Sequence, residues 1–99
     1  MTIEYLAGLI DGEGHITMFS SVNGRGEHHQ RALIRVVQSE HNQGEQLFDI
    51  IKANYGGTIC YKAKYGMYEW SIYGKQAVAL AEQLRPYLLV KAYQVERIL

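Results

Sequence analysis

The chain has 99 residues, enough for one hydrophobic core, so we expect one domain over residues 1–99 and no second independent domain. Ten Lys and Arg residues balance ten Asp and Glu residues, and this formal net charge of zero gives no sign of a polyanionic partner. The lone Cys60 excludes an intramolecular disulfide, and the start of the chain lacks the basic and apolar stretches of a signal peptide. We therefore expect an intracellular protein that does not enter a membrane.

The first half of the chain has the pattern of a helix followed by a β-hairpin. Apolar residues at helical spacing predict a helix over residues 3–12, and glycines at its end are expected to stop it. Two β-rich segments, residues 15–20 and 32–37, flank the turn-forming residues 23–26. This pattern predicts two antiparallel strands joined by a moderately long loop.

The second half repeats this order and adds a helix. Asn42 and Glu45 have the spacing of a capping box, which predicts a helix that continues to Tyr55 and stops at Gly56 and Gly57. The elements expected after it are two strands and two helices, over residues 58–62, 67–72, 75–84 and 87–99. The order α-ββ-α-ββ-α-α predicts an α+β fold, with a four-stranded, antiparallel, saddle-like sheet that has its helices on one face. The other face is then free to bind a ligand.

Residues 6–14 form a motif that carries chemistry. They read Leu-Ala-Gly-Leu-Ile-Asp-Gly-Glu-Gly, which resembles the motif of the LAGLIDADG homing endonuclease family at seven of nine letters. The two departures are conservative, because Gly12 replaces another small residue and Glu13 keeps a carboxylate. The resemblance extends in element order along nearly the whole chain. It implies a homodimeric, intron-encoded type of nuclease with one motif in each chain.

The predicted first helix has two faces with different roles. Its large apolar residues are expected to face the core of the chain. Small side chains at i, i+3 and i+4 spacing form a stripe along which a second helix can approach closely. We predict a dimer interface on this stripe, at Ala7, Gly8, Asp11 and Gly12. For Asp11, a capping or hydrogen-bonding role at the helix end is an equal alternative to a direct part in catalysis.

Glu13 lies at the end of the predicted helix, where the helix dipole is negative and favours a cation. Its carboxylate is a hard oxygen ligand of the kind that Mg²⁺ prefers. Two such helices side by side place two carboxylates near one axis, an arrangement suited to cleaving a phosphodiester. We predict that Glu13 is catalytic and binds Mg²⁺, and we expect no small-molecule cofactor.

The resemblance implies two further catalytic residues. Gln38 lies where single-motif enzymes carry a Gln that orients water beside the metal ions. Strict strand alternation points Gln38 inward, so this role requires a bend at the end of the strand. Lys91 ends a segment that resembles the family pattern Leu-x-Pro-aromatic-Leu-x-x-Lys, and it is expected near the scissile phosphate. Some relatives carry a basic residue at the start of the second helix, where His41 and Asn42 are candidate substitutes in this chain.

Strand alternation assigns the side chains of the open sheet face. A two-stranded β-ribbon fits the major groove of DNA, so we predict that this face reads DNA. Arg31, Arg35 and Lys62 are expected to bind guanine edges, and Glu69 to bind cytosine. Phe19, Leu33 and Met67 are unusually apolar for a solvated face and are expected to contact thymine methyl groups. The other predicted DNA contacts are His15, Thr17, Ser21, Thr58, Cys60, Lys64 and Ser71.

Alternation also predicts which strand residues face inward, toward the helices. Met18 and Tyr61 are among these residues, with Ile16, Ala32, Ile34, Val36, Ile59, Tyr68, Trp70 and Ile72.

Charge is distributed unevenly along the chain. Residues 14–38 and 57–75, the two predicted hairpins, hold six Lys and Arg against two Glu, while the remaining residues hold four basic against eight acidic. The neutral total therefore conceals a basic sheet backed by acidic helices, which suits binding to DNA.

The sequence predicts a homodimeric endonuclease that makes a metal-dependent double-strand break in a pseudo-palindromic DNA site of roughly twenty base pairs. By resemblance, the cut crosses the minor groove and leaves 3′ overhangs. One alternative is a non-cleaving nucleic-acid-binding protein of the same fold, such as an RNA splicing maturase or a regulator. The other is a protein-interaction module that uses its first helix only to dimerise.

Overall fold

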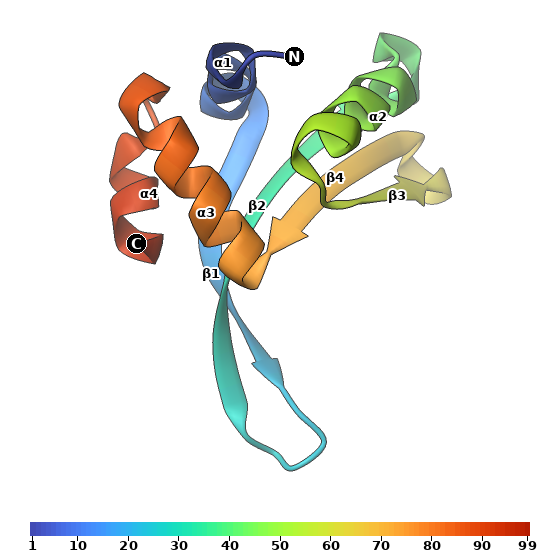
Figure 1. Ribbon diagram of the computed structural model, residues 1–99. Helices are drawn as coiled ribbons and strands as arrows, with labels where there is room; N and C mark the ends of the chain where they lie inside the picture. Colours follow the sequence, from blue (N-terminus) through green and yellow to red (C-terminus); the bar gives the residue numbers. More distant parts are fainter.

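The computed structural model describes the backbone of residues 1–99 and every side chain except that of Ser21. Helices and strands follow one another in the predicted order (Figure 1). The helices are α1 (Ile3–Glu13), α2 (Gly44–Tyr55), α3 (Gly74–Leu84) and α4 (Ala92–Ile98). The strands are β1 (Gly14–Val22), β2 (His28–Ser39), β3 (Thr58–Lys62) and β4 (Met67–Tyr73). Short 3₁₀ turns lie at η1 (Glu40–Asn42), η2 (Ala63–Tyr65) and η3 (Arg85–Tyr87).

The four strands form one antiparallel sheet in the order β1-β2-β4-β3. All four helices cover the same face of this sheet, and the β1–β2 hairpin extends beyond them (Figure 1). The predicted α+β fold is therefore confirmed. In the part of the chain that the structure describes, no helix is both long and apolar enough to cross a membrane.

The core fills the space between the sheet and the helices. α3 packs across β2 and β4, α4 packs against β1, and α2 packs against β4. Trp70 of β4 is fully buried, and its indole Nε1 donates to the carbonyl oxygen of Gly56 at 2.8 Å. Gly57 has a φ of +94°, and a β-carbon there would lie 2.6 Å from Nε1 of Trp70. Only glycine fits this position, which explains why α2 ends at a glycine pair.

Two inward residues of the predicted strands are less buried than expected. Met18 is 39% exposed, because it lines an open groove between the β1–β2 hairpin and the ends of α3 and α4. Tyr61 is 45% exposed, because β3 is an edge strand at the margin of the helical layer. Its hydroxyl donates to Glu40 Oε2 at 2.6 Å. The hydrophobic core therefore includes fewer strand residues than alternation predicts, because Met18 and Tyr61 lie at its margins.

The capping box predicted at the start of α2 is wrong. The residue before the helix is Gln43, which adopts the left-handed conformation with a φ of 56° and makes no side-chain cap. Ser39 instead caps η1, since its Oγ accepts from the backbone N–H of His41 at 3.1 Å. Asn42 turns its side chain to β2.

The last helix is shorter than predicted. It begins at Ala92, whereas the apolar spacing predicts helix from residue 87. A non-helical loop over residues 88–91 lies between η3 and α4. The reason is a distant contact, because backbone amides of this loop donate to the carboxylate of Asp11 on α1.

Candidate active site and open sheet face

Glu13 ends α1, and its carboxylate is exposed at the point where the chain turns into β1. Gln38 of β2 donates from Nε2 to Glu13 Oε2 at 2.6 Å, so the fold brings together two side chains that lie 25 positions apart. Gln38 lies on the same side of β2 as the buried Val36, as alternation predicts. The expected bend is absent, because β2 and β4 remain paired as far as Ser39. α1 ends on the inward side of the sheet, and there Gln38 reaches Glu13 directly.

Asp11 anchors the loop that precedes α4. Its two carboxylate oxygens accept hydrogen bonds from the backbone N–H groups of Leu89, Val90 and Lys91, at 2.8, 3.0 and 2.9 Å. Burial raises the pKa of Asp11, but these three hydrogen bonds and the charge of Lys91 outweigh it and lower the pKa below its usual value. Of the two roles predicted for Asp11, the geometry favours the hydrogen-bonding one.

Lys91 lies at the same end of α1 as Glu13. Its Nζ donates to the backbone carbonyl of Asp11 at 2.8 Å. The C-terminal end of a helix carries partial negative charge, which favours a cation at this position. The structure thus places Glu13, Gln38 and Lys91 around one helix terminus, with Gln38 reaching it from the sheet and Lys91 from the loop.

The stripe predicted for dimerisation is only partly exposed. Ala7 is fully buried in the core of its own chain, so its assignment to the interface is wrong. The helix turns Ala7 inward together with Leu6 and Ile10. Gly8 and Gly12 are exposed, and a β-carbon built at either position meets nothing within 4 Å. These two glycines leave the backbone of α1 open to close approach by another helix.

Each chain offers a divalent cation one exposed carboxylate at the end of α1, that of Glu13. Among the side chains that the structure describes, no three His, Cys, Asp or Glu side chains gather into a metal-binding cluster. Mg²⁺ is commonly held by one or two carboxylates, with water and substrate phosphate as its other ligands. The exposed Glu13 carboxylate satisfies that requirement.

The register of the sheet defines the open face. Across the strands, Arg35 pairs with His15 and Ser71, and Thr58 continues this row. The predicted DNA-facing strand residues therefore share one face. Val37 and Tyr73 also lie on this face, in register with Glu69 and Leu33, and were not among the predicted residues. Alternation alone could have found Val37, and Tyr73 was missed because the strand runs one residue further than predicted.

Two residues of the predicted DNA-reading set are buried, so their predicted exposure is wrong. Leu33 is 8% exposed and Ser71 is 6% exposed. Thr58 Oγ1 and Ser71 Oγ share a hydrogen bond of 3.3 Å. Phe19 is half-buried and packs edge-on against Tyr73, with ring centroids 5.4 Å apart. The apolar side chains of this face therefore pack together between the polar ones.

The remaining predicted contacts vary in position and exposure. Arg31, Cys60 and His15 are exposed, whereas Met67 and Thr17 are half-buried. Lys64 lies in η2 beyond the end of β3, with its Nζ 5.5 Å from the ring centroid of Tyr65. The side chain of Ser21 lies outside the described residues.

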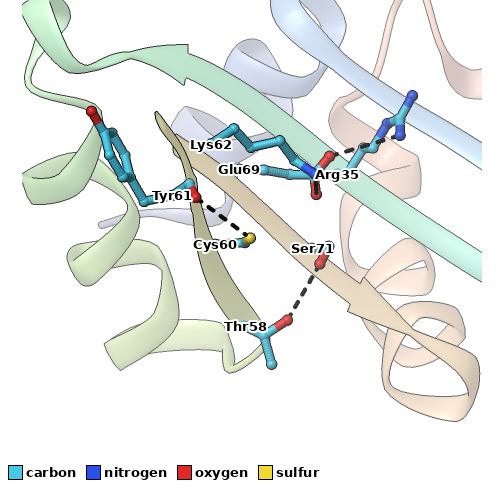
Figure 2. A network of polar contacts seen from close by, with 7 residues as sticks. All are labelled: Arg35, Thr58, Cys60, Tyr61, Lys62, Glu69 and Ser71. Carbon is cyan, nitrogen blue, oxygen red and sulfur yellow. Dashed lines mark hydrogen bonds and ion pairs between the residues drawn. The ribbon is translucent and has the colours of Figure 1, made fainter. Parts of the chain in front are cut away.

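Glu69 joins two of the cations on the open face. Its carboxylate lies 3.7 Å from Arg35 and 3.9 Å from Lys62. Figure 2 shows Glu69 between these two side chains. The Glu69 side chain is 16% exposed, whereas those of Arg35 and Lys62 are 46% and 47% exposed. Both cations therefore have a counter-ion within the chain before any ligand binds.

A family profile described as "LAGLIDADG endonuclease" matches residues 6–95. No curated protein matches the chain.

Solved structures of homing endonucleases share the fold. I-CvuI, solved in complex with its target in the presence of calcium, is 29% identical and superposes with a TM-score of 0.81 over 95% of this chain. I-TnaI is 18% identical, with a TM-score of 0.73 over 99% of this chain and 69% of its own. The archaeal intron-encoded I-Vdi141I, complexed with DNA, is 17% identical, with a TM-score of 0.75 over 97% of this chain and 63% of its own. At these two lower identities the likeness extends to the fold alone. The present chain spans 60% of the length of I-CvuI.

Proposed function

Because this chain belongs to the LAGLIDADG endonuclease family, we propose that it is a homodimeric nuclease that cuts both strands of a specific DNA site. The observation that carries this proposal is the cluster at the end of α1. There an exposed carboxylate, Glu13, is held by Gln38 at 2.6 Å, beside the ammonium-bearing Lys91. Carboxylate, amide and ammonium groups in one place are the components expected for metal-dependent hydrolysis of a phosphodiester.

Each of the three residues has a distinct role in the proposed reaction. Glu13 would hold Mg²⁺, which would supply positive charge beside the phosphate. Gln38 fixes the position of the Glu13 carboxylate and orients water beside it. Lys91 places a positive charge where negative charge develops on the phosphoryl oxygens.

The proposed site requires two chains. One chain supplies a single exposed carboxylate at the helix end, and its Gly8 and Gly12 leave α1 open to a second copy of itself. Contact between two α1 helices through these glycines brings the two Glu13 carboxylates near one axis. A two-fold dimer reads a pseudo-palindromic site, of which each chain covers about half of roughly twenty base pairs.

DNA lies on the open face of the sheet in this proposal. Arg31, Arg35 and Lys62 supply donors for guanine edges or phosphates, and Phe19 and Met67 supply apolar contacts. Glu69 is paired with two of these cations, so a contact from Glu69 to cytosine requires them to move. That I-CvuI was solved in complex with its target supports DNA as the ligand.

A binding selection followed by a cleavage assay tests the proposal. Duplexes with a randomised segment of about 30 base pairs are selected for binding in EDTA, at about 50–200 mM salt, and are then given Mg²⁺. We expect a pseudo-palindromic consensus and cleavage of both strands within it. Selected DNA that stays intact in Mg²⁺ would instead identify a regulator. Recovery of no DNA would identify an interaction module, and a parallel selection on RNA would reveal a maturase.

A further inference from the structure

Asn42, at the end of η1, lies beside the proposed active site. Its Nδ2 donates to Gln38 Oε1 at 3.0 Å. Gln38 in turn donates from Nε2 to Glu13 Oε2 at 2.6 Å. The three side chains therefore form one hydrogen-bonded chain that ends on the proposed metal ligand.

The orientation of the Gln38 amide is fixed by its partners. The backbone N–H of Ser39 is only a donor, and it lies 3.1 Å from Oε1, so this atom must be the amide oxygen. Asn42 adds a second donor to the same oxygen. The opposite orientation would turn Nε2 toward these donors and turn Oε1 toward the Glu13 carboxylate. Ser39 and Asn42 together therefore direct the Gln38 N–H at Glu13.

η1 is held firmly in the place that this contact requires. The backbone N–H of Glu40 donates to the carbonyl of Gly66 at 3.0 Å, and the carboxylate of Glu40 accepts from the Tyr61 hydroxyl at 2.6 Å. At the start of α2, a β-carbon on Gly44 would lie 2.9 Å from the carbonyl oxygen of Gln38. Glycine at this position lets the turn pack directly on the end of β2, which brings Asn42 within reach of Gln38.

We propose that Asn42 is a positioning residue that acts on Glu13 through the amide of Gln38. This inference rests on the proposed function of the site. It replaces the expectation that Asn42 substitutes for a basic residue in contacting a phosphate. An amide donor that is already engaged with a neighbouring side chain supplies orientation, whereas a basic side chain supplies charge.

A double-mutant cycle distinguishes these two roles, with Asn42→Ala and Gln38→Met alone and together. Loss of one hydrogen bond predicts a single-turnover cleavage rate about 3- to 10-fold lower in Asn42→Ala, with the Kd for DNA within about 2-fold of the original. In the Gln38→Met background the same change should alter the rate by less than about 2-fold, because the group through which Asn42 acts is gone. A direct phosphate contact predicts weaker DNA binding in both backgrounds, by more than about 2-fold, with an unchanged salt slope because the Asn42 amide carries no charge. That result would overturn the proposal.

A second readout needs neither metal nor cleavage. The side-chain amide signals of Gln38 in the NMR spectrum of the metal-free protein are identified by their loss in Gln38→Met. We expect Asn42→Ala to shift these signals, whereas His41→Ala, a change at an exposed neighbour on the same turn, should leave them in place. Unchanged signals in Asn42→Ala overturn the role of Asn42. A wild-type protein that binds DNA and never cuts it overturns the proposed function instead.

Discussion

Glu69 occupies the open sheet face between the side chains of Arg35 and Lys62. Residue type and strand position predict a reader of cytosine, whereas the structure shows a counter-ion. In the proposed complex the two cations would exchange Glu69 for DNA phosphates, and this exchange would weaken non-specific binding.

Glu69→Gln therefore should strengthen binding to random-sequence DNA, by about 3- to 10-fold at low salt, because each freed cation gains about one phosphate contact. The plot of log Kd against log salt should become steeper by about one to two units. Fluorescence anisotropy over a salt series measures both quantities. Glu27→Gln, an exposed residue in the β1–β2 loop, is the matched control, since it changes the net charge equally. Equal slopes for the two variants would show that Glu69 does not restrain the cations.

The loop over residues 88–91 is non-helical because of its contact with a residue that is distant in the sequence. Its apolar spacing suits a helix, but three of its backbone N–H groups donate to Asp11, which lies 78 to 80 positions away in the sequence. Local patterns predict hairpins and amphipathic helices well because those depend on near neighbours. They cannot predict a loop whose conformation depends on a carboxylate from another helix.

Dependence on distant contacts also explains why only part of the candidate site could be predicted from the sequence. Glu13 was predictable because the motif and the helix end lie in one short segment. Alternation correctly pointed Gln38 inward, yet only the three-dimensional packing shows that α1 ends on that side. The position of Asn42 depends on the left-handed Gln43, on Gly44 and on the anchored turn, none of which has a clear sequence signal.

Asp11→Asn should destabilise the protein by about 1–2 kcal/mol at pH 7, because an amide accepts hydrogen bonds less strongly than a carboxylate and retains only one acceptor oxygen. The pKa of Asp11 is lowered in the folded state, so its stabilisation is present above the unfolded value of 3.8 and is lost as the pH falls through the folded value. Urea unfolding at pH 7, 5 and 3 should therefore show a difference that shrinks only below about pH 4. Asp49→Asn, at an exposed position on α2, is the control. Equal stability of the two variants at pH 7 would contradict the anchoring role.

The exposed glycines of α1, Gly8 and Gly12, are where a second copy of the chain is proposed to bind. Gly12→Leu should leave the fold intact, since nothing lies within 4 Å of an added β-carbon and leucine favours helix. The added side chain should keep two α1 helices apart and raise the dimer dissociation constant about 10- to 100-fold. Sedimentation equilibrium measures this change. Ala79→Leu, at an exposed site on α3, should leave it unaffected. A Gly12→Leu protein that dimerises as tightly as the original would place the interface elsewhere.

The proposed nuclease activity depends on the carboxylate of Glu13. The most direct test assays the wild-type protein and Glu13→Gln on the same selected duplex. Each protein is present at a concentration that saturates the duplex, and each is assayed with and without Mg²⁺. Both proteins should bind the duplex with Kd values within about 2-fold, because Glu13 lies at the end of α1 and not on the DNA-reading face. Only the wild type should cut both strands, with the rate of the variant lower by at least about 100-fold. Cleavage by Glu13→Gln at the wild-type rate would show that Glu13 is not a catalytic residue.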